Sequence, residues 1–442
     1  MKQKVDLIVH SARQLLTLGE VEVPSALSIS PSCPRRGEAM NELGLIEDGA
    51  VAVSRGLVTL VGTTEEVLAQ TEAEEMIDAS NRVVMPGFVD PHTHLVFAGS
   101  REDEFESRLR GTTYMEIMAA GGGIMSTVRA TRVATLPQLI AQSRGRLDRM
   151  LAHGTTTAEA KSGYGLNVDD ELKMLEAIRQ LDATHPVDLV PTFLGAHAVP
   201  VEFKGRADEY VEVVINEMLP LTERELRENA SGASAPSVPF FCDVFCEEGV
   251  FSVSQSRRIL ERARELGFGL KVHADEFEPL GGTSLAVELG AVSADHLVCT
   301  PVDEIEALAG SDTIAVSLPG TPFGLGHHEY TPARQIIEAG GALALATDLN
   351  PGTCYCESMQ IIIALACRYM RLTPAEAIAA TTLNAAHALG LGDRVGSLET
   401  GKKADILVLD IPNYRHLGYH FGVNLVERVI KSGQVLYRNS GK

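Results

Sequence analysis

The chain has 442 residues, of which 45% are apolar and 22% charged, a composition typical of a globular protein with more than one domain. Its formal net charge of −21 argues against nucleic acid as a partner, because phosphate binding needs a basic face. No run reaches the roughly 18 apolar residues that a membrane span requires, so we expect no membrane partner.

Both ends of the sequence predict β-strands. Apolar residues alternate or pair in AVAVSRGLVTLVG near the start and in ADILVLDI and VNLVERVIKSGQVLYR near the end. Because chain termini often lie close together, we expect residues 1–85 and 390–442 to form one small composite β-sandwich domain.

Between these ends, residues 86–389 alternate strand-like and helix-like segments. The strand candidates are VVMPGFVD, GTTTAEAKSG, PVDLVPTFLGAH, PFFCDVFCEEG, LKVHADE, AVSADHL, TIAVSLPG and LALATDLNPG. The helix candidates are Leu136–Leu151, Asp169–Leu181, Ser254–Leu266, Val302–Leu308, Pro332–Ala339 and Ser358–Met370. Eight strands are the number that a closed barrel requires, so we predict an α/β fold with a TIM-like (β/α)8 barrel.

Polar side chains stand at or just after the carboxyl ends of nearly all the strand candidates. They are His92, His94, Glu159, Lys161, Tyr164, His197, Glu247, Glu248, His273, Glu276, Asp295, His296, Asp348 and Asn350. In a parallel barrel these ends converge on one face, where barrel enzymes hold their active sites. The pattern therefore predicts one polar site at that face, which scattered core histidines would not produce.

The pair His92 and His94 suggests a metal site. In an extended chain, residues two apart point the same way, so both imidazoles can face one cation. An isolated pair of this kind is more often a pair of packed or exposed histidines. With His273 and Asp348 the set gains a third imidazole and a carboxylate, the donor types of a catalytic site that keeps a position open for water.

The cysteines point to a reducing compartment. There are seven, an odd number, and they are scattered, which is typical of free thiols in the cytoplasm. The pair Cys354 and Cys356 is spaced as a metal or redox pair could be, although isolated thiols are the more frequent case.

The segment Glu223–Pro239 ends in Ala, Ser and Pro and is predicted to be a surface excursion.

The motifs together resemble the amidohydrolase superfamily, and within it the imidazolonepropionase family of histidine degradation. They are PHTHLVFAGSRE, GGGIMSTV, GTTTAEAKSGYGL, DLVPTFLGAHAVP, GLKVHADE, AVSADHL and ATDLNPG. The resemblance implies hydrolysis of the cyclic amide C–N bond of 4-imidazolone-5-propanoate to N-formimidoyl-L-glutamate. It also implies a homodimer that acts on a small molecule with a carboxylate arm, in addition to the cytoplasmic location that the free thiols predict.

The resemblance implies a role for each candidate residue. One zinc or iron ion would be held by His92, His94, His273 and Asp348. The catalytic acid/base groups would be Glu276, His296 and Asp348. The substrate would be bound by Arg101, Tyr164, His197, Glu276, Asn350, Gly352 and Thr353. Binuclear relatives carry a metal-bridging lysine late in strand four; VFCEEG has none here, so we expect a single metal with Lys161 in a supporting role.

Two other functions fit parts of the pattern. A mononuclear deaminase of another heterocycle would share the metal-binding residues. Arg101 together with Tyr164 and His197 instead favours a ring that carries a carboxylate arm, because a guanidinium suits a carboxylate. Arg101 could instead form a surface ion pair with Glu102, Asp103 or Glu104. A catalytically dead barrel used as a scaffold should have lost some of the ligands, and none is missing.

Overall fold

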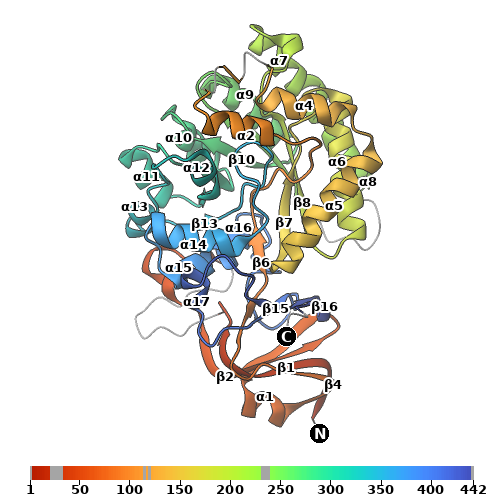
Figure 1. The fold of residues 1–442 in the computed structure, drawn as a ribbon, viewed down its shortest axis with the longest axis vertical. Helices are drawn as coiled ribbons and strands as arrows, with labels where there is room; N and C mark the ends of the chain where they lie inside the picture. Colours follow the sequence, from red (N-terminus) through yellow and green to blue (C-terminus); the bar gives the residue numbers. More distant parts are fainter. Residues whose placement is uncertain (1, 20–32, 113–115, 118–120, 230–238, 440–442) are drawn as a thin grey trace.

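The computed structural model describes residues 2–19, 33–112, 116–117, 121–229 and 239–439. Figure 1 shows two parts: a barrel surrounded by helices, and below it a sheet near which both termini lie. Among the described residues, no helix is both long enough and apolar enough to cross a membrane.

The barrel is a sheet of eight parallel strands in chain order. They are β6 (Phe88–Asp90), β7 (Thr155–Lys161), β8 (Asp188–Ala196), β9 (Phe241–Cys246), β10 (Gly269–Ala274), β11 (Ser293–His296), β12 (Ile314–Ser317) and β13 (Leu343–Leu345). Each of these strands overlaps one of the eight segments that the sequence predicts as strands. The side chains of β7 and β10 to β13 are buried on both faces, apart from the first residue of β10. This burial explains the largely apolar sequences of β12 and β13.

The barrel is closed between its first and last strands by contacts just beyond β6 and β13. Thr93 and Leu349 form a parallel bridge, and the amide of His94 donates to the carbonyl of Leu349 at 2.9 Å. The Asp90 carboxylate accepts from the backbone amide of Thr347 at 3.0 Å and from its hydroxyl at 2.6 Å. These contacts bring the segment after strand one beside the segment after strand eight.

Helices cover the outside of the barrel (Figure 1). They are α2 (Glu102–Leu109), α4 (Ile124–Val133), α5 (Leu136–Ala152), α6 (Val168–Thr184), α7 (Ala207–Val213), α8 (Leu219–Asn229), α9 (Val253–Glu265), α10 (Gly282–Leu289), α11 (Val302–Ala309), α12 (Gly320–Leu325), α13 (Ala333–Glu338), α14 (Met359–Tyr369), α15 (Pro374–Ala380) and α16 (Leu383–His387). In α9, burial of Ser256, Ile259, Leu260 and Ala263 follows the helical period. All six predicted helices are present, with ends that differ by at most three residues.

The termini form a second sheet, separate from the barrel. It contains β1 (Gln3–Leu16), β2 (Leu45–Ser54), β3 (Leu57–Thr63), β4 (Thr71–Asp78), β5 (Val83–Pro86), β14 (Ile406–Leu409), β15 (Val426–Lys431) and β16 (Gln434–Arg438). Helix α1 (Thr64–Gln70) packs against it, and α17 (His416–Tyr419) follows β14. Leu7, Val53 and Ile406, from distant parts of the chain, share one buried cluster. The composite β domain expected from the sequence is therefore one continuous sheet; its bounds, 1–85 and 390–442, stay a prediction.

One detail of the expected organisation is wrong. The candidate strand VVMPGFVD is divided at Gly87, because β5 pairs with β14 while β6 pairs with β7. A Cβ at Gly87 would lie 2.2 Å from Oγ1 of Thr156, so the chain passes from one sheet to the other at a point of close contact. The segment Glu223–Pro239, predicted to be a surface excursion, begins as helix: Glu223–Asn229 are the end of α8, a stretch rich in helix-forming Glu, Arg and Leu. Residues 230–238 of that prediction lie outside the described residues.

Candidate active site

The two histidines after β6 point the same way. His92 is fully buried and His94 is 3% exposed. The intervening Thr93 points elsewhere, with its hydroxyl donating to the carbonyl of Glu159 at 2.6 Å. This alternation is the one expected of an extended chain, and it aims both imidazoles at the mouth of the barrel.

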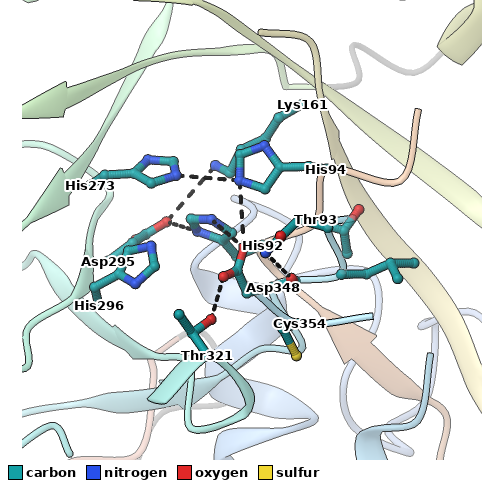
Figure 2. A network of polar contacts seen from close by, with 12 residues as sticks. His92, Thr93, His94, Lys161, His273, Asp295, His296, Thr321, Asp348 and Cys354 are labelled. Carbon is teal, nitrogen blue, oxygen red and sulfur yellow. Dashed lines mark hydrogen bonds and ion pairs between the residues drawn. The ribbon is translucent and has the colours of Figure 1, made fainter. Parts of the chain in front are cut away.

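The four predicted metal ligands meet at this point (Figure 2). His94 Nε2 lies 3.4 Å from His273 Nε2 and 3.5 Å from Asp348 Oδ1, which is 3.7 Å from His92 Nε2. Among the residues that the structure describes, two groups of side chains are close enough to share one ion: His92 with His94 and Asp348, and His92 with His273 and His296. The predicted set of four is thus distributed over both groups, and His296 also stands within ligand distance.

Two carboxylates orient the histidines toward the centre. Asp295 Oδ2 lies 2.6 Å from Nδ1 of His92, and Asp243 Oδ2 lies 2.9 Å from Nδ1 of His273. A carboxylate beside Nδ1 favours a proton there, which leaves Nε2 free to bind a metal. The Nε2 atom of His92 is buried and has no hydrogen-bond partner among the described residues. A buried, unpaired imidazole nitrogen beside other donors fits a metal site.

Burial keeps the imidazoles of His92 and His94 neutral, which is the form that binds metal. It lowers the pKa of His92 well below its usual value, and the charge of Lys161 adds to the effect. It lowers the pKa of His94 in the same way, together with His197. Burial raises the pKa of Asp348 to about 6, although a hydrogen bond from the hydroxyl of Thr321 opposes the shift.

Two of the site residues have an unusual backbone conformation. Asp348 has a φ of +52° and His296 a φ of +78°, both in the left-handed region. Side chains larger than hydrogen disfavour this region, and such residues cluster at functional sites. In both residues, the backbone conformation that places the side chain at the barrel mouth is locally unfavourable.

Tyr164 and His197 form an aromatic wall next to the histidine cluster. The His197 ring stacks on that of His94 at 4.8 Å, with 15° between the planes. Its Nδ1 lies 3.0 Å from the carbonyl of Gly163, which leaves Nε2 available. The Tyr164 ring lies 5.3 Å from that of His197, and burial raises the pKa of its hydroxyl, which stays a hydrogen-bond donor.

The two acid/base candidates also lie together. Glu276 Oε2 lies 3.6 Å from His296 Nε2, and their side chains are 9% and 3% exposed. Burial raises the pKa of Glu276 well above its usual value, and the charges of Asp348 and Glu247 act in the same direction. Burial lowers the pKa of His296. The pair can hold and pass one proton beside the metal-binding side chains.

Arg101 is held on two sides. Its Nε and Nη2 lie 2.9 and 2.8 Å from Oε2 of Glu104, which is one of the ion pairs considered from the sequence. A Cβ on Gly352 would be only 2.1 Å from Nη1 of Arg101, so the backbone of Gly352 lies against the guanidinium. Arg101 thus combines an internal ion pair with a position beside the segment that follows strand eight.

The amide of Asn350 organises the segment after Asp348. Its Oδ1 accepts from the backbone amides of Gly352 and Thr353 at 2.8 Å each. Its Nδ2 donates to the carbonyl of Asp348 at 2.8 Å and to the hydroxyl of Thr353 at 2.9 Å. The side-chain amide of Asn350 thus makes its hydrogen bonds within its own turn. This turn holds Gly352 next to Arg101.

The sequence interpretation missed the carboxylates behind the histidines. Asp243 was not singled out, and Asp295 was noted only for its place at the end of a strand. A signal was present, because Asp243 interrupts the apolar run PFFCDVFC, and a charge inside a buried strand needs a partner. Cys354 and Cys356 are in neither metal-capable group; the buried Cys354 thiol donates to the carbonyl of Thr347 at 3.1 Å.

Comparisons with known proteins agree with this geometry. The profile of the Amidohydrolase family matches residues 83–436. An imidazolonepropionase of Herpetosiphon aurantiacus is 55% identical over 413 residues, 93% of this chain and 96% of that protein. One of Chloroflexus aggregans is 50% identical over 434 residues, 98% of this chain and 99% of that protein.

Solved structures share the fold at low sequence identity. A zinc-bound adenosine deaminase of Xanthomonas campestris has a TM-score of 0.71 at 20% identity, covering 98% of this chain and 93% of that one. The guanine deaminase of E. coli has a TM-score of 0.66 at 16% identity, covering 99% of this chain and all of that one. The family generally binds a metal, for which the clustered histidines provide donors. The chain therefore belongs to the amidohydrolase family and, within it, to the imidazolonepropionases.

Proposed function

We propose that the chain hydrolyses the ring C–N bond of 4-imidazolone-5-propanoate and releases N-formimidoyl-L-glutamate. The observation that carries the proposal is the convergence of His92, His94, His273 and Asp348 at the barrel mouth, beside the pair Glu276 and His296. The names of relatives at 55% and 50% identity agree with it.

One zinc or iron ion is the proposed cofactor, held by His92, His94, His273 and Asp348. When bound, such an ion polarises a carbonyl and lowers the pKa of a water toward neutrality. The ammonium of Lys161 is already engaged by Asp243 at 2.7 Å and Glu159 at 2.8 Å, which supports a site for a single ion.

Proton transfer is assigned to Glu276, His296 and Asp348. Water attack on the ring carbonyl requires a base, and Asp348 or Glu276 is placed to accept that proton. The ring nitrogen must gain a proton as its bond to carbon breaks. His296 is the proposed donor, and Glu276, 3.6 Å away, can return a proton to it.

The rest of the site is proposed to bind the substrate. Tyr164 and His197 would pack along the ring, with the Tyr164 hydroxyl as a donor. Arg101 would bind the propanoate carboxylate, for which a guanidinium has matching geometry. The turn of Asn350, Gly352 and Thr353 would contact the substrate or the product.

Deamination of another heterocycle is the alternative reaction. The deaminases among the solved structures share the fold alone, at 16–20% identity. Turnover of 4-imidazolone-5-propanoate should be compared with turnover of guanine and cytosine, with metal content measured on the same preparation. Hydrolysis of the first substrate alone supports the proposal, and release of ammonia from guanine or cytosine at a higher kcat/KM would overturn it. Metal-free protein with no turnover would instead indicate a scaffold.

We also propose a cytoplasmic homodimer that does not bind nucleic acid. The net charge of −21 disfavours nucleic acid as a partner. Analytical ultracentrifugation gives the oligomeric state, and a monomer at micromolar concentration would contradict the dimer.

A further inference from the structure

Lys161 lies in the interior of the barrel with no access to solvent. Its side chain is 0% exposed, as are those of Glu159, Asp243 and Asp295 around it. The Lys161 Nζ atom lies 2.7 Å from Asp243 Oδ2, 2.8 Å from Glu159 Oε2 and 3.9 Å from Asp295 Oδ2. One ammonium therefore contacts carboxylates from three strands, β7, β9 and β11.

Two of these carboxylates are the ones that orient the site histidines. The same Oδ2 of Asp243 that contacts Lys161 lies 2.9 Å from Nδ1 of His273. The same Oδ2 of Asp295 lies 2.6 Å from Nδ1 of His92. Lys161 is thus the first member of two chains of contacts, one through Asp243 to His273 and one through Asp295 to His92. Figure 2 shows Lys161, Asp295 and His92, the members of the second chain.

We propose that Lys161 is a positioning residue of the metal centre: its ammonium fixes Asp243 and Asp295 so that His273 and His92 present Nε2 to one ion. Residues that hold metal-binding histidines in orientation typically contribute 10–100-fold to metal affinity. The inference rests on the proposed metal ligands and concerns affinity for the ion, not the reaction.

The charge of Lys161 suits this role. Burial lowers its pKa, but the charges of Asp243, Glu159 and Asp295 outweigh burial and raise the pKa above the ordinary value. An ammonium at this point attracts the carboxylates of Asp243 and Asp295 and so holds both in place. The zero exposure of the side chain argues against Lys161 as a nucleophile or base that touches the substrate.

Lys431 provides a matched control in the same chain. It is also buried, at 5% exposure, and its Nζ lies 2.6 Å from both Asp188 Oδ2 and Asp405 Oδ2. It bridges two carboxylates as Lys161 does, but it belongs to β15 in the sheet of the termini. Removal of either ammonium takes a positive charge away from the carboxylates that it contacts, so loss of stability alone does not distinguish the two.

The test measures metal affinity without substrate. Lys161→Met and Lys431→Met are prepared with wild type, stripped with a chelator and titrated with Zn²⁺ against a chromogenic competitor. We expect Lys161→Met to raise the Kd for Zn²⁺ by 10–100-fold and Lys431→Met to leave it within about twofold while lowering the melting temperature. Lys161→Gln, which keeps a hydrogen-bond donor, should give an intermediate Kd.

Several outcomes would overturn the inference. A folded Lys161→Met or Lys161→Gln protein with wild-type affinity for Zn²⁺ contradicts it directly. A similar loss of Zn²⁺ affinity in Lys431→Met also contradicts it. So would a result in which Lys431→Met folds but neither Lys161→Met nor Lys161→Gln does. If wild type binds Zn²⁺ but does not hydrolyse the imidazolone, the proposed function fails and this inference stands.

Discussion

Gly352 lies directly against Arg101: a Cβ built on Gly352 would be 2.1 Å from Nη1 of the arginine. Glu104 contacts the same guanidinium from the other side, at Nε and Nη2. The guanidinium is therefore fixed between α2 and the turn that follows Asp348. Its position makes Arg101 sensitive to small changes in either neighbour.

Gly352→Ala should weaken substrate binding. The added methyl group must displace the guanidinium, and loss of one charged hydrogen-bonded contact costs about 1.5–3 kcal/mol, which is a factor of roughly 10–100 in KM. Steady-state kinetics on 4-imidazolone-5-propanoate measures the effect, with kcat expected to change less than KM. Gly145→Ala in α5 is the control, since its nearest contact would be an ordinary 3.7 Å from Arg149. An unchanged KM for Gly352→Ala would count against Arg101 as the group that binds the carboxylate.

Glu104→Gln should also raise KM, by several-fold. Glu104 Oε2 fixes Arg101, and its Oε1 accepts from the backbone amide of Gly123 at 3.1 Å, so it ties the arginine to the glycine-rich segment. The neutral amide pairs more weakly with the guanidinium. Glu106→Gln is a matched control, because Glu106 pairs with Arg110 on the exposed side of the same helix. If both variants bind substrate as wild type does, Glu104 has no part in orienting Arg101.

His273→Ala and Asp348→Ala should each remove turnover together with bound metal. Both side chains lie within 3.5 Å of Nε2 of His94, so each loss opens the proposed site. Metal content by elemental analysis and hydrolysis by product assay are measured on the same samples. Chelator treatment of wild type should give the same loss, reversed by Zn²⁺ or Fe²⁺. Near-wild-type turnover in either variant would refute the ligand assignment.

His296→Asn separates two roles that the geometry leaves open. The proposal makes His296 an acid/base group, whereas its distance from His92 and His273 would also allow it to bind metal. As an acid/base group its loss should lower kcat by about 10²–10⁴-fold with metal content unchanged. A parallel fall in metal content would instead make it a ligand.

The barrel and the place of the site could be predicted from local sequence. Some strands that are buried on both faces have largely apolar sequences, such as IAVS in β12 and LAL in β13. The polar side chains at the carboxyl ends of the strands mark the mouth of a parallel barrel. The shared direction of His92 and His94 could be predicted because the two residues lie on one face of an extended segment. None of these inferences depends on the register of neighbouring strands.

The remaining parts depend on contacts between distant strands. The pairing of Asp243 with His273 and of Asp295 with His92 is decided by the register of β9, β10, β11 and the segment after β6. No local pattern encodes that register. Similarly, the ion pair of Arg101 with Glu104 and the close approach of Gly352 depend on how the turn after strand eight folds back on α2.

His387 should make the protein less stable in mild acid. It lies in α16, where burial lowers its pKa to about 4, and the charge of Lys402 adds to the effect. The folded protein keeps this imidazole neutral, while the unfolded chain takes up a proton below pH 6.5. Stability from this group is therefore present above pH 6.5 and is lost as the pH falls toward 4, at about 1.4 kcal/mol per pH unit.

His387→Gln should flatten this dependence, because glutamine does not titrate. The urea midpoint of unfolding is measured for wild type and variant between pH 7.5 and 5, where the difference between the two slopes isolates His387 from the other buried histidines. His420→Gln is the control, since His420 is exposed and its replacement should leave the slope unchanged. Parallel slopes for wild type and His387→Gln would show that His387 titrates alike in the folded and unfolded chain, which its burial beside Lys402 argues against.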